Sequence, residues 1–175
     1  MEILMNQVTL MNFSFRRPLI QDLEQIMEIE RSGFSPAEAA SKEAMIERIQ
    51  VINDSFLLVV NEDDQPIGYA VGPVIPERYL YDELFEKTVP NPSTGGYQTI
   101  TILSLVVAPA YQKLGIASTL LTELAQRSRE AERIGLTLTC LKELIPFYEK
   151  NGYQVEGISS SQHAGEIWYD LVLDL

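Results

Sequence analysis

The chain has 175 residues, of which 46% are apolar and 22% charged, and these values are typical of one soluble globular domain spanning residues 1–175. A chain of this length buries roughly 70% of its unfolded surface, so it needs neither disulfides nor a metal to fold. Its 13 basic and 25 acidic residues give a net charge of −12. This charge argues against nucleic acid or an anionic membrane as a partner, because phosphate contacts need Lys and Arg.

The charge is unevenly distributed along the chain. Residues 1–100 hold 16 acidic and 7 basic residues, a net charge of −9, whereas residues 101–175 hold 9 and 6, a net charge of −3. The stretch 109–129 is locally positive, and we expect an anionic ligand there if the protein binds one. A cationic substrate suits the acidic part better.

Cysteine content and terminal patterning favour a reducing compartment. The lone Cys140 cannot form an internal disulfide, and its apolar neighbours predict a buried core thiol rather than a nucleophile. The N-terminal stretch lacks an arginine-rich region and a small-residue cleavage site, and no run of 18 apolar residues occurs. We therefore predict a cytoplasmic protein.

The first predicted elements are one strand and two helices. Alternating apolar residues predict a strand over 12–16, and helical spacing of apolar residues predicts a helix over 19–31. Ser35 followed by Glu38 three residues later matches a capping box. That pattern predicts a second helix over 35–51.

The remaining sequence alternates strands and helices. Apolar runs at 55–60 and 66–72 around a polar turn predict a hairpin. Residues 73–96, rich in Pro and Gly around a short amphipathic piece at 78–87, form an excursion of the kind that often serves as a lid or binding loop. The dense β-branched run 99–107 predicts a strand buried on both faces. The last predicted elements are a helix at 116–132, a strand at 134–141, a short helix at 146–150 and strands at 153–157 and 166–173.

The loop before the 116–132 helix has the properties of a phosphate site. Gly115 allows backbone N–H groups to approach a ligand closely, and a helix start offers unpaired donors and positive potential. The motifs GxxxxGK[ST] and GxGxxG are absent, so kinase, GTPase and dehydrogenase functions lose support. Taken alone, these residues also fit an ordinary strand-to-helix turn.

Two motifs in this order resemble those of a known superfamily. Gln112, Gly115 and Ala117 match Gln/Arg-x-x-Gly-x-Gly/Ala, which resembles the acetyl-CoA loop of GNAT N-acetyltransferases. The segment 145–153 (IPFYEKNGY) is similar to the second GNAT signature, in which a short helix carries a tyrosine near the thioester. The resemblance extends over 13–175.

Three pieces suggest a branch of that superfamily. They are the sequences EIER at 28–31, ERYL at 77–80 and PFYEK at 146–150. Together they look like the arylalkylamine (serotonin-type) N-acetyltransferases.

The resemblance implies an α/β (α+β) fold and a mechanism. The expected fold is a mixed, mostly antiparallel central sheet of about seven strands flanked by helices. Its strand at Leu105 to Val107 splays from the strand at 134–141 and admits the cofactor between them. The expected reaction is direct attack of a primary amine on acetyl-CoA in a ternary complex, with Tyr148 protonating the departing CoA thiolate.

The resemblance also implies which residues bind acetyl-CoA. Backbone groups of the splayed strand would pair with pantetheine, and an N–H near Leu105 would stabilise the developing oxyanion. Loop amides and the Ser118 hydroxyl would bind pyrophosphate, while Lys113 either contacts the phosphates or is solvated. The full implied set is Leu105, Val106, Val107, Gln112, Lys113, Leu114, Gly115, Ile116, Ala117, Ser118 and Phe147.

The general base is the weakest part of the match. The serotonin-type branch carries two histidines on its central strand, and this chain has Thr101 and Leu103 at those positions. Glu30 is the candidate base, acting through water, although a solvated or capping glutamate is the more common role for such a residue. The only histidine, His163, is expected to lie exposed in a polar loop.

The first functional hypothesis is acetylation of a small cationic amine, either an arylalkylamine or a polyamine. The first two helices and the 73–96 excursion would form its pocket, including Phe34, Tyr79, Tyr81 and Phe85. Acetylation of a protein N-terminus or lysine is one alternative, and a non-catalytic acetyl-CoA-binding module is another. The chain is expected to act as a monomer or homodimer.

Overall fold

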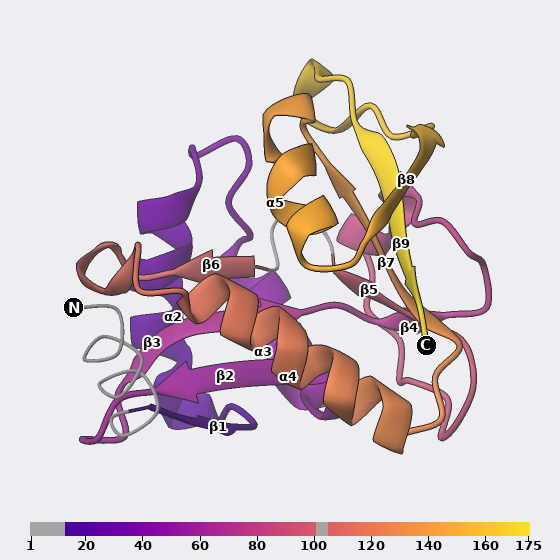
Figure 1. Ribbon diagram of the computed structural model, residues 1–175. Coiled ribbons are helices and arrows are strands. Elements are labelled where there is room, and N and C mark those ends of the chain that lie inside the picture. The colour runs from indigo at the N-terminus through magenta and orange to yellow at the C-terminus, as the bar shows by residue number, and fades with distance from the viewer. Residues whose placement is uncertain (1–12, 101–104) are drawn as a thin grey trace.

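The computed structural model describes residues 13–100 and 105–175, which form two sheets and their covering helices (Figure 1). The strands are β1 (Ser14–Arg16), β2 (Phe56–Val60), β3 (Pro66–Val71), β4 (Val74–Ile75), β5 (Tyr97–Ile100), β6 (Leu105–Val107), β7 (Gly135–Cys140), β8 (Gln154–Ile158) and β9 (Tyr169–Asp174). The α-helices are α2 (Leu23–Gly33), α3 (Lys42–Val51), α4 (Ile116–Glu130) and α5 (Ile145–Lys150). Short 3-10 turns are η1 (Ile20–Asp22), η2 (Asn53–Ser55), η3 (Asp82–Phe85), η4 (Pro109–Tyr111), η5 (Lys142–Leu144) and η6 (His163–Gly165).

The strands form a first sheet in the order β1-β2-β3-β6 and a second in the order β4-β5-β7-β9-β8. All pairings are antiparallel except that of β5 with β7. The predicted α/β class with a mixed, mostly antiparallel sheet is confirmed. The strands divide between two sheets because β5 and β6 pair with different neighbours.

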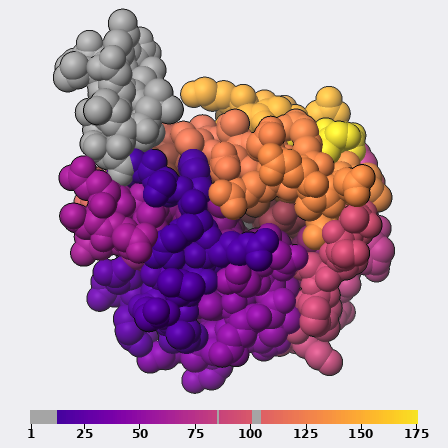
Figure 2. Space-filling model, turned by 90° about the horizontal axis from the view of Figure 1, so that it is seen from below, coloured from indigo at the N-terminus to yellow at the C-terminus, as the bar shows by residue number. Residues whose placement is uncertain are grey.

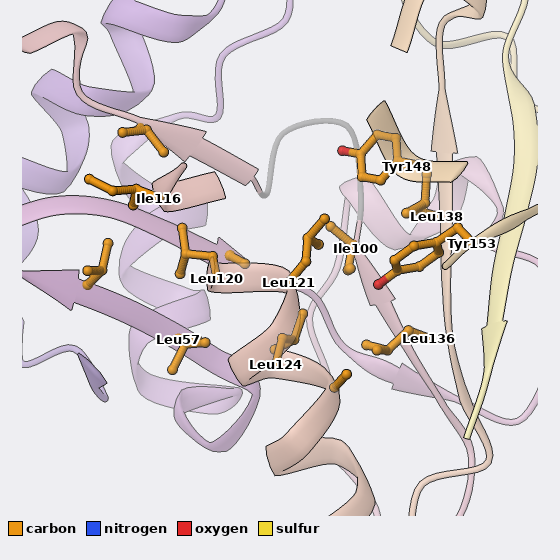
Figure 3. Close-up of a cluster of buried hydrophobic side chains, with 14 of the residues drawn as sticks. Leu57, Ile100, Ile116, Leu120, Leu121, Leu124, Leu136, Leu138, Tyr148 and Tyr153 are labelled. Carbon is orange, nitrogen blue, oxygen red and sulfur yellow. The ribbon is translucent and has the colours of Figure 1, made fainter. Parts of the chain in front are cut away.

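Side chains of β2 alternate between two hydrophobic layers. Leu57 and Val59 pack with α4 and with β7 of the second sheet, whereas Phe56 and Leu58 pack with α2 and α3. Every residue of β2 is buried because both faces of the first sheet are covered. One core under α4 therefore joins the two sheets, and Figure 3 shows its side chains converging from both.

The predicted 99–107 strand is divided between the sheets. β5 pairs in parallel with β7 up to Ile100 opposite Leu138, while β6 pairs with β3, with Leu105 opposite Ala70. The predicted splay between β6 and β7 is confirmed by this change of partner. Thr101 and Leu103, where the histidine relay is missing, lie outside the described residues.

The second predicted helix begins later than expected. α3 starts at Lys42 because the Ser41 hydroxyl caps it, accepting a hydrogen bond from the Ala44 N–H at 3.1 Å. Ser35 and Glu38 do bond as a capping pair, with the Ser35 hydroxyl 2.7 Å from Glu38 Oε1. That pair closes only an isolated turn, since side-chain bonds of this kind satisfy local donors without requiring a helix to continue.

The predicted amphipathic piece at 78–87 contains one short helical turn, η3. The other predicted strands and helices occur with shifts of a few residues at their ends. Within the described ranges, no helix combines the length and the apolar character needed to cross a membrane.

The two sheets approach most closely where β3 ends. The Thr99 N–H and hydroxyl both lie 2.9 Å from the Pro73 carbonyl oxygen, and a Cβ added at Gly72 would lie 1.9 Å from the Thr99 carbonyl oxygen. We expect Gly72→Ala to lower the free energy of unfolding by about 3 kcal/mol or more, because backbone must move to relieve the overlap. Urea unfolding followed by circular dichroism measures this.

The matched control is Gly95→Ala. Gly95 has a φ of +74° and open space around an added Cβ, so only the backbone conformation is penalised, by about 1–2 kcal/mol. Equal losses in the two variants would contradict close packing of the sheets at Gly72.

Candidate active site

The loop before α4 opens onto a cavity of about 280 Å³. Gly115 caps the helix with a φ of +80°, and Lys113 also has a positive φ of +66°. The cavity brings together most of the predicted cofactor-binding residues, Leu105, Val106 and Leu114 excepted. Its lining consists of Val107, Tyr111, Gln112, Lys113, Gly115, Ile116, Ala117, Ser118 and Phe147.

The electrostatics of this cavity favour an anion. The first N–H groups of a helix have no intrahelical partner and carry partial positive charge. The first turn of α4 contains no acidic residue that would neutralise this charge, and Lys113 lines the same cavity. An added Cβ at Gly115 would meet nothing within 4 Å, so the backbone is accessible there. The residues present therefore fit a pyrophosphate group.

The side chain of Gln112 bonds to the protein backbone rather than facing a ligand. Its side-chain amide Nε2 donates to the Val107 carbonyl oxygen at 3.0 Å. Gln112 thereby ties the loop to the end of β6. In the described part of the chain, β6 is the last strand of the first sheet. Its outer edge can therefore pair with an extended ligand.

Tyr148 lies on α5 beside this cavity. Its side chain is 8% exposed, and its ring makes edge contacts with Phe147 at 5.0 Å and Tyr153 at 5.7 Å between centroids. In Figure 3 the Tyr148 hydroxyl points away from Leu138 and Tyr153. Burial raises the pKa of Tyr148, with a smaller effect from Cys140. The hydroxyl therefore remains protonated at neutral pH.

Cys140 is a core thiol, as expected. It is 2% exposed on β7, and burial, with a smaller effect from Glu143, raises its pKa to about 12. A thiol held in this state is a poor nucleophile at neutral pH.

Glu30 is buried rather than solvated. Its side chain is 0% exposed, and it accepts hydrogen bonds from the Ala40 N–H at 2.8 Å and from the Tyr69 hydroxyl. Burial raises the pKa of Glu30 despite these bonds and the nearby Arg48. Each carboxylate oxygen thus accepts one hydrogen bond from the protein, so Glu30 is not the solvated glutamate that the sequence offered as the alternative to a base.

The 34–41 segment and the loop that carries His163 lie near each other close to Glu30. The 34–41 segment forms a hollow of about 500 Å³, lined by Met27, Arg31, Phe34, Pro36, Ala39, Ala40, Ser41 and Lys42. The pKa of Glu38 in this segment is lowered mainly by hydrogen bonds from Ser35, with a smaller effect from His163. His163 is half-buried, with its ring centroid 6.3 Å from that of Trp168. It is therefore not the exposed loop residue expected from the sequence.

The 73–96 excursion is fastened to the second sheet. Arg78 pairs with Glu156 at 2.7 Å and with Asp174 at 2.9 Å, and the Ser161 hydroxyl donates to Asp82 at 2.5 Å. Tyr79 donates to Glu156 at 2.7 Å, so its hydroxyl lies at β8. The side chain of Phe85 lies outside the described residues.

Sequence patterns did not reveal two contributors to the site. Tyr111 lines the loop cavity and accepts a hydrogen bond from Asn61 at 3.2 Å, but it stands among ordinary loop residues. Tyr69, the partner of Glu30, lies in an apolar strand, where an aromatic residue is expected as core. Only the register of β3 against β2 and β6 places its hydroxyl toward α2.

Comparisons with known proteins agree with this geometry. The family model described as "Acetyltransferase (GNAT) family" matches residues 23–153. No curated protein sequence matches the chain significantly.

Solved structures with the same fold cover 93% of this chain. A protein described as a GNAT-family acetyltransferase from Desulfovibrio desulfuricans is 25% identical, with a TM-score of 0.67 over 98% of its chain. The loading GNAT-like domain of CurA from Lyngbya majuscula is 15% identical, with a TM-score of 0.77 over 97%. Arabidopsis thaliana Naa50, solved with a bisubstrate analogue, is 15% identical, with a TM-score of 0.69 over 99%. The chain belongs to the GNAT acetyltransferase family.

Proposed function

We propose that the protein transfers the acetyl group of acetyl-CoA to a primary amine by direct attack in a ternary complex. One observation carries the proposal: a single cavity joins the 112–118 loop to Phe147, the neighbour of Tyr148. The two sequence signatures thus meet in space. Acetyl-CoA supplies the activated acyl group as a thioester.

Binding of the cosubstrate is assigned to the loop and to β6. The amides at the start of α4 and the Ser118 hydroxyl would hold the pyrophosphate, with Lys113 adding a positive charge. The outer edge of β6, from Leu105 to Val107, would hydrogen-bond the pantetheine arm as a neighbouring strand would. An N–H on that edge would stabilise negative charge developing on the carbonyl oxygen.

Tyr148 is proposed as the proton donor to the leaving thiolate. A thiolate with a pKa near 8.5 gains from protonation as it departs. The pKa of Tyr148 is raised by burial, so its hydroxyl keeps its proton throughout the physiological range. The hydroxyl is therefore in the protonated form that a donor needs, not in the phenolate form that a base needs.

Glu30 is proposed to position the 34–41 segment. The hydrogen bond that Glu30 accepts from the Ala40 N–H holds that segment against α2. The hydrogen bond from the Tyr69 hydroxyl holds the Glu30 side chain in place. Glu30 is also 0% exposed, so it lacks the solvent contact that a base acting through water needs. We therefore propose that the amine enters the reaction already neutral.

A small cationic amine, an arylalkylamine or polyamine, is the proposed acceptor. The net charge of −9 in residues 1–100 attracts an ammonium ion and raises its local concentration.

We propose a reducing cytoplasm as the compartment, since Cys140 is a free thiol.

Acetylation of a protein N-terminus is the second candidate. It is favoured by the likeness to Naa50, whose structure holds a bisubstrate analogue of CoA and a peptide. A panel of tryptamine, spermidine and N-terminal peptides in a thiol-release assay tests both. Turnover of the small amines alone supports the first candidate, and turnover of peptides alone supports the second. If calorimetry shows acetyl-CoA binding but no acceptor causes release of the CoA thiol between pH 6 and 9, the protein is a non-catalytic acetyl-CoA-binding module.

Two substitutions separate chemistry from cosubstrate binding. We expect Tyr148→Phe to lower kcat by about 100-fold or more with little change in acetyl-CoA affinity, because it removes only the proton donor. Gly115→Leu should weaken acetyl-CoA affinity first, since its side chain would occupy the approach to the loop amides. Steady-state kinetics and calorimetry measure the two effects.

Tyr153→Phe is the matched control for Tyr148. The Tyr153 hydroxyl is buried without a hydrogen-bond partner in the described residues, so its removal should leave turnover nearly unchanged. Wild-type turnover in Tyr148→Phe would remove Tyr148 from the acid role.

The pH profile tests the absence of a protein base. An amine with a pKa near 10 gains about tenfold in neutral fraction for each pH unit from 6 to 9. We expect kcat/KM for the amine to rise with that slope, and no decline over this range because Tyr148 stays protonated. Glu30→Gln should keep the slope while lowering stability. A slope that flattens in the wild type and is restored by Glu30→Gln would identify Glu30 as the base.

A further inference from the structure

A third hollow lies at the opposite end of α4 from the Gly115 loop. It has a volume of about 380 Å³, and the 15 residues of α4 place it about 22 Å along the helix from the loop. Figure 2 looks onto this side of the molecule, where the indigo, pink and orange segments meet around the hollow. Its lining comprises Arg17, Asp54, Ser55, Phe56, Leu57, Ser93, Gln98, Leu124, Arg127, Glu130, Ala131 and Arg133.

Three arginines from separate segments line this hollow. The Arg133 side chain is 6% exposed, and its Nη1 donates to the carbonyl oxygens of Pro92 at 2.8 Å and Gly95 at 3.1 Å. Its Nη2 lies 3.9 Å from Asp54, which is too far for a hydrogen bond. The Arg133 guanidinium is therefore held rigidly with donors left over.

The other two arginines also retain donors. Arg127 uses its Nε for Glu123 at 3.0 Å, which leaves its terminal nitrogens available. Arg17 follows β1, and its guanidinium makes no hydrogen bond or ion pair within 13–100 and 105–175. Such groups match the oxygens of a carboxylate or phosphate in pairs.

The floor of the hollow is polar and fixed. Ser55 and Gln98 are 4% and 5% exposed. The Ser55 hydroxyl accepts from Asn91 at 2.8 Å, and Gln98 Oε1 accepts from the Ser128 hydroxyl at 2.9 Å. These bonds hold the floor in one arrangement before any ligand binds.

The two acidic residues in the lining are partly occupied elsewhere. Asp54 accepts from Asn91 at 3.0 Å, and Glu130 accepts from Gln126 at 3.1 Å. Three arginines and two acids line this hollow, and Glu123, which pairs with Arg127 at 3.0 Å, brings the acids to three. The hollow is thus locally balanced in charge, on a chain whose net charge is −12.

We propose that this hollow binds a small metabolite through a carboxylate or phosphate group. Its volume lies in the range of small-molecule sites rather than that of a bare ion. Ala131, which is half-buried, offers apolar surface for the body of the ligand, while the arginines bind its charge. The site does not depend on the proposed acetyl transfer, because it shares no residue with the loop cavity.

The test is a titration of amide NMR shifts at constant ionic strength. The probes are inorganic phosphate, benzoate and the neutral isostere benzamide. We expect saturable shifts with at least one of the two anions, confined to residues 54–57, 93–98 and 127–133, and none with benzamide. Shifts only at 112–118, or no saturation with either anion, would overturn the proposal.

Variants identify the groups responsible. Arg17→Ala and Arg127→Ala should each weaken anion binding at least tenfold. Arg129→Ala, on the same helix but outside the hollow, is the control and should change the affinity less than twofold. Equal weakening in all three variants would show attraction to bulk charge and would contradict a built site.

Discussion

The fold depends on one short stretch of backbone, residues 97–107, whose two ends belong to different sheets. The end at β5 pairs with β7, and the end at β6 pairs with β3. The sheets cannot separate further, because Leu57 of the first and Leu136 of the second share one core with α4. They cannot close either, because the backbones already meet at Gly72 and Thr99. The opening between β6 and β7 is therefore set by packing before any ligand arrives.

The sequence predicted those parts of the structure that local physics determines. Alternation and dense apolar runs placed the β2–β3 hairpin, and Gly115 with the following helix placed the loop that lines the cavity. The predicted start of the second helix, α3, was wrong. Ser35 and Ser41 offer similar capping chemistry, and only tertiary packing selects between them. The family resemblance predicted the splay from residues 134–141, but the division of the 99–107 run between two sheets was not predicted, since an apolar β-branched run carries no information about its partners.

Glu30 shows why the candidate site was harder to predict than the fold. A glutamate at the end of an amphipathic helix is normally solvated, and its spacing alone gives no reason to expect otherwise. Its burial arises from β3, which supplies the Tyr69 hydroxyl, and from the 34–41 segment, which supplies the Ala40 N–H. Contacts between segments so far apart in sequence have no local signature. The surroundings of a polar residue can thus change from solvent to a buried, hydrogen-bonded environment without any change in its neighbours along the chain.

The place of β9 in the second sheet has a consequence for how the protein forms during synthesis. β9 lies between β7 and β8, so β8 has no neighbour to pair with until residues 169–174 have left the ribosome. Leu171 of the same strand is fully buried in the core shared with α4. A nascent chain therefore exposes one edge of β7 and part of the core until translation of this segment is complete. During that interval the incomplete chain is open to pairing with other strands.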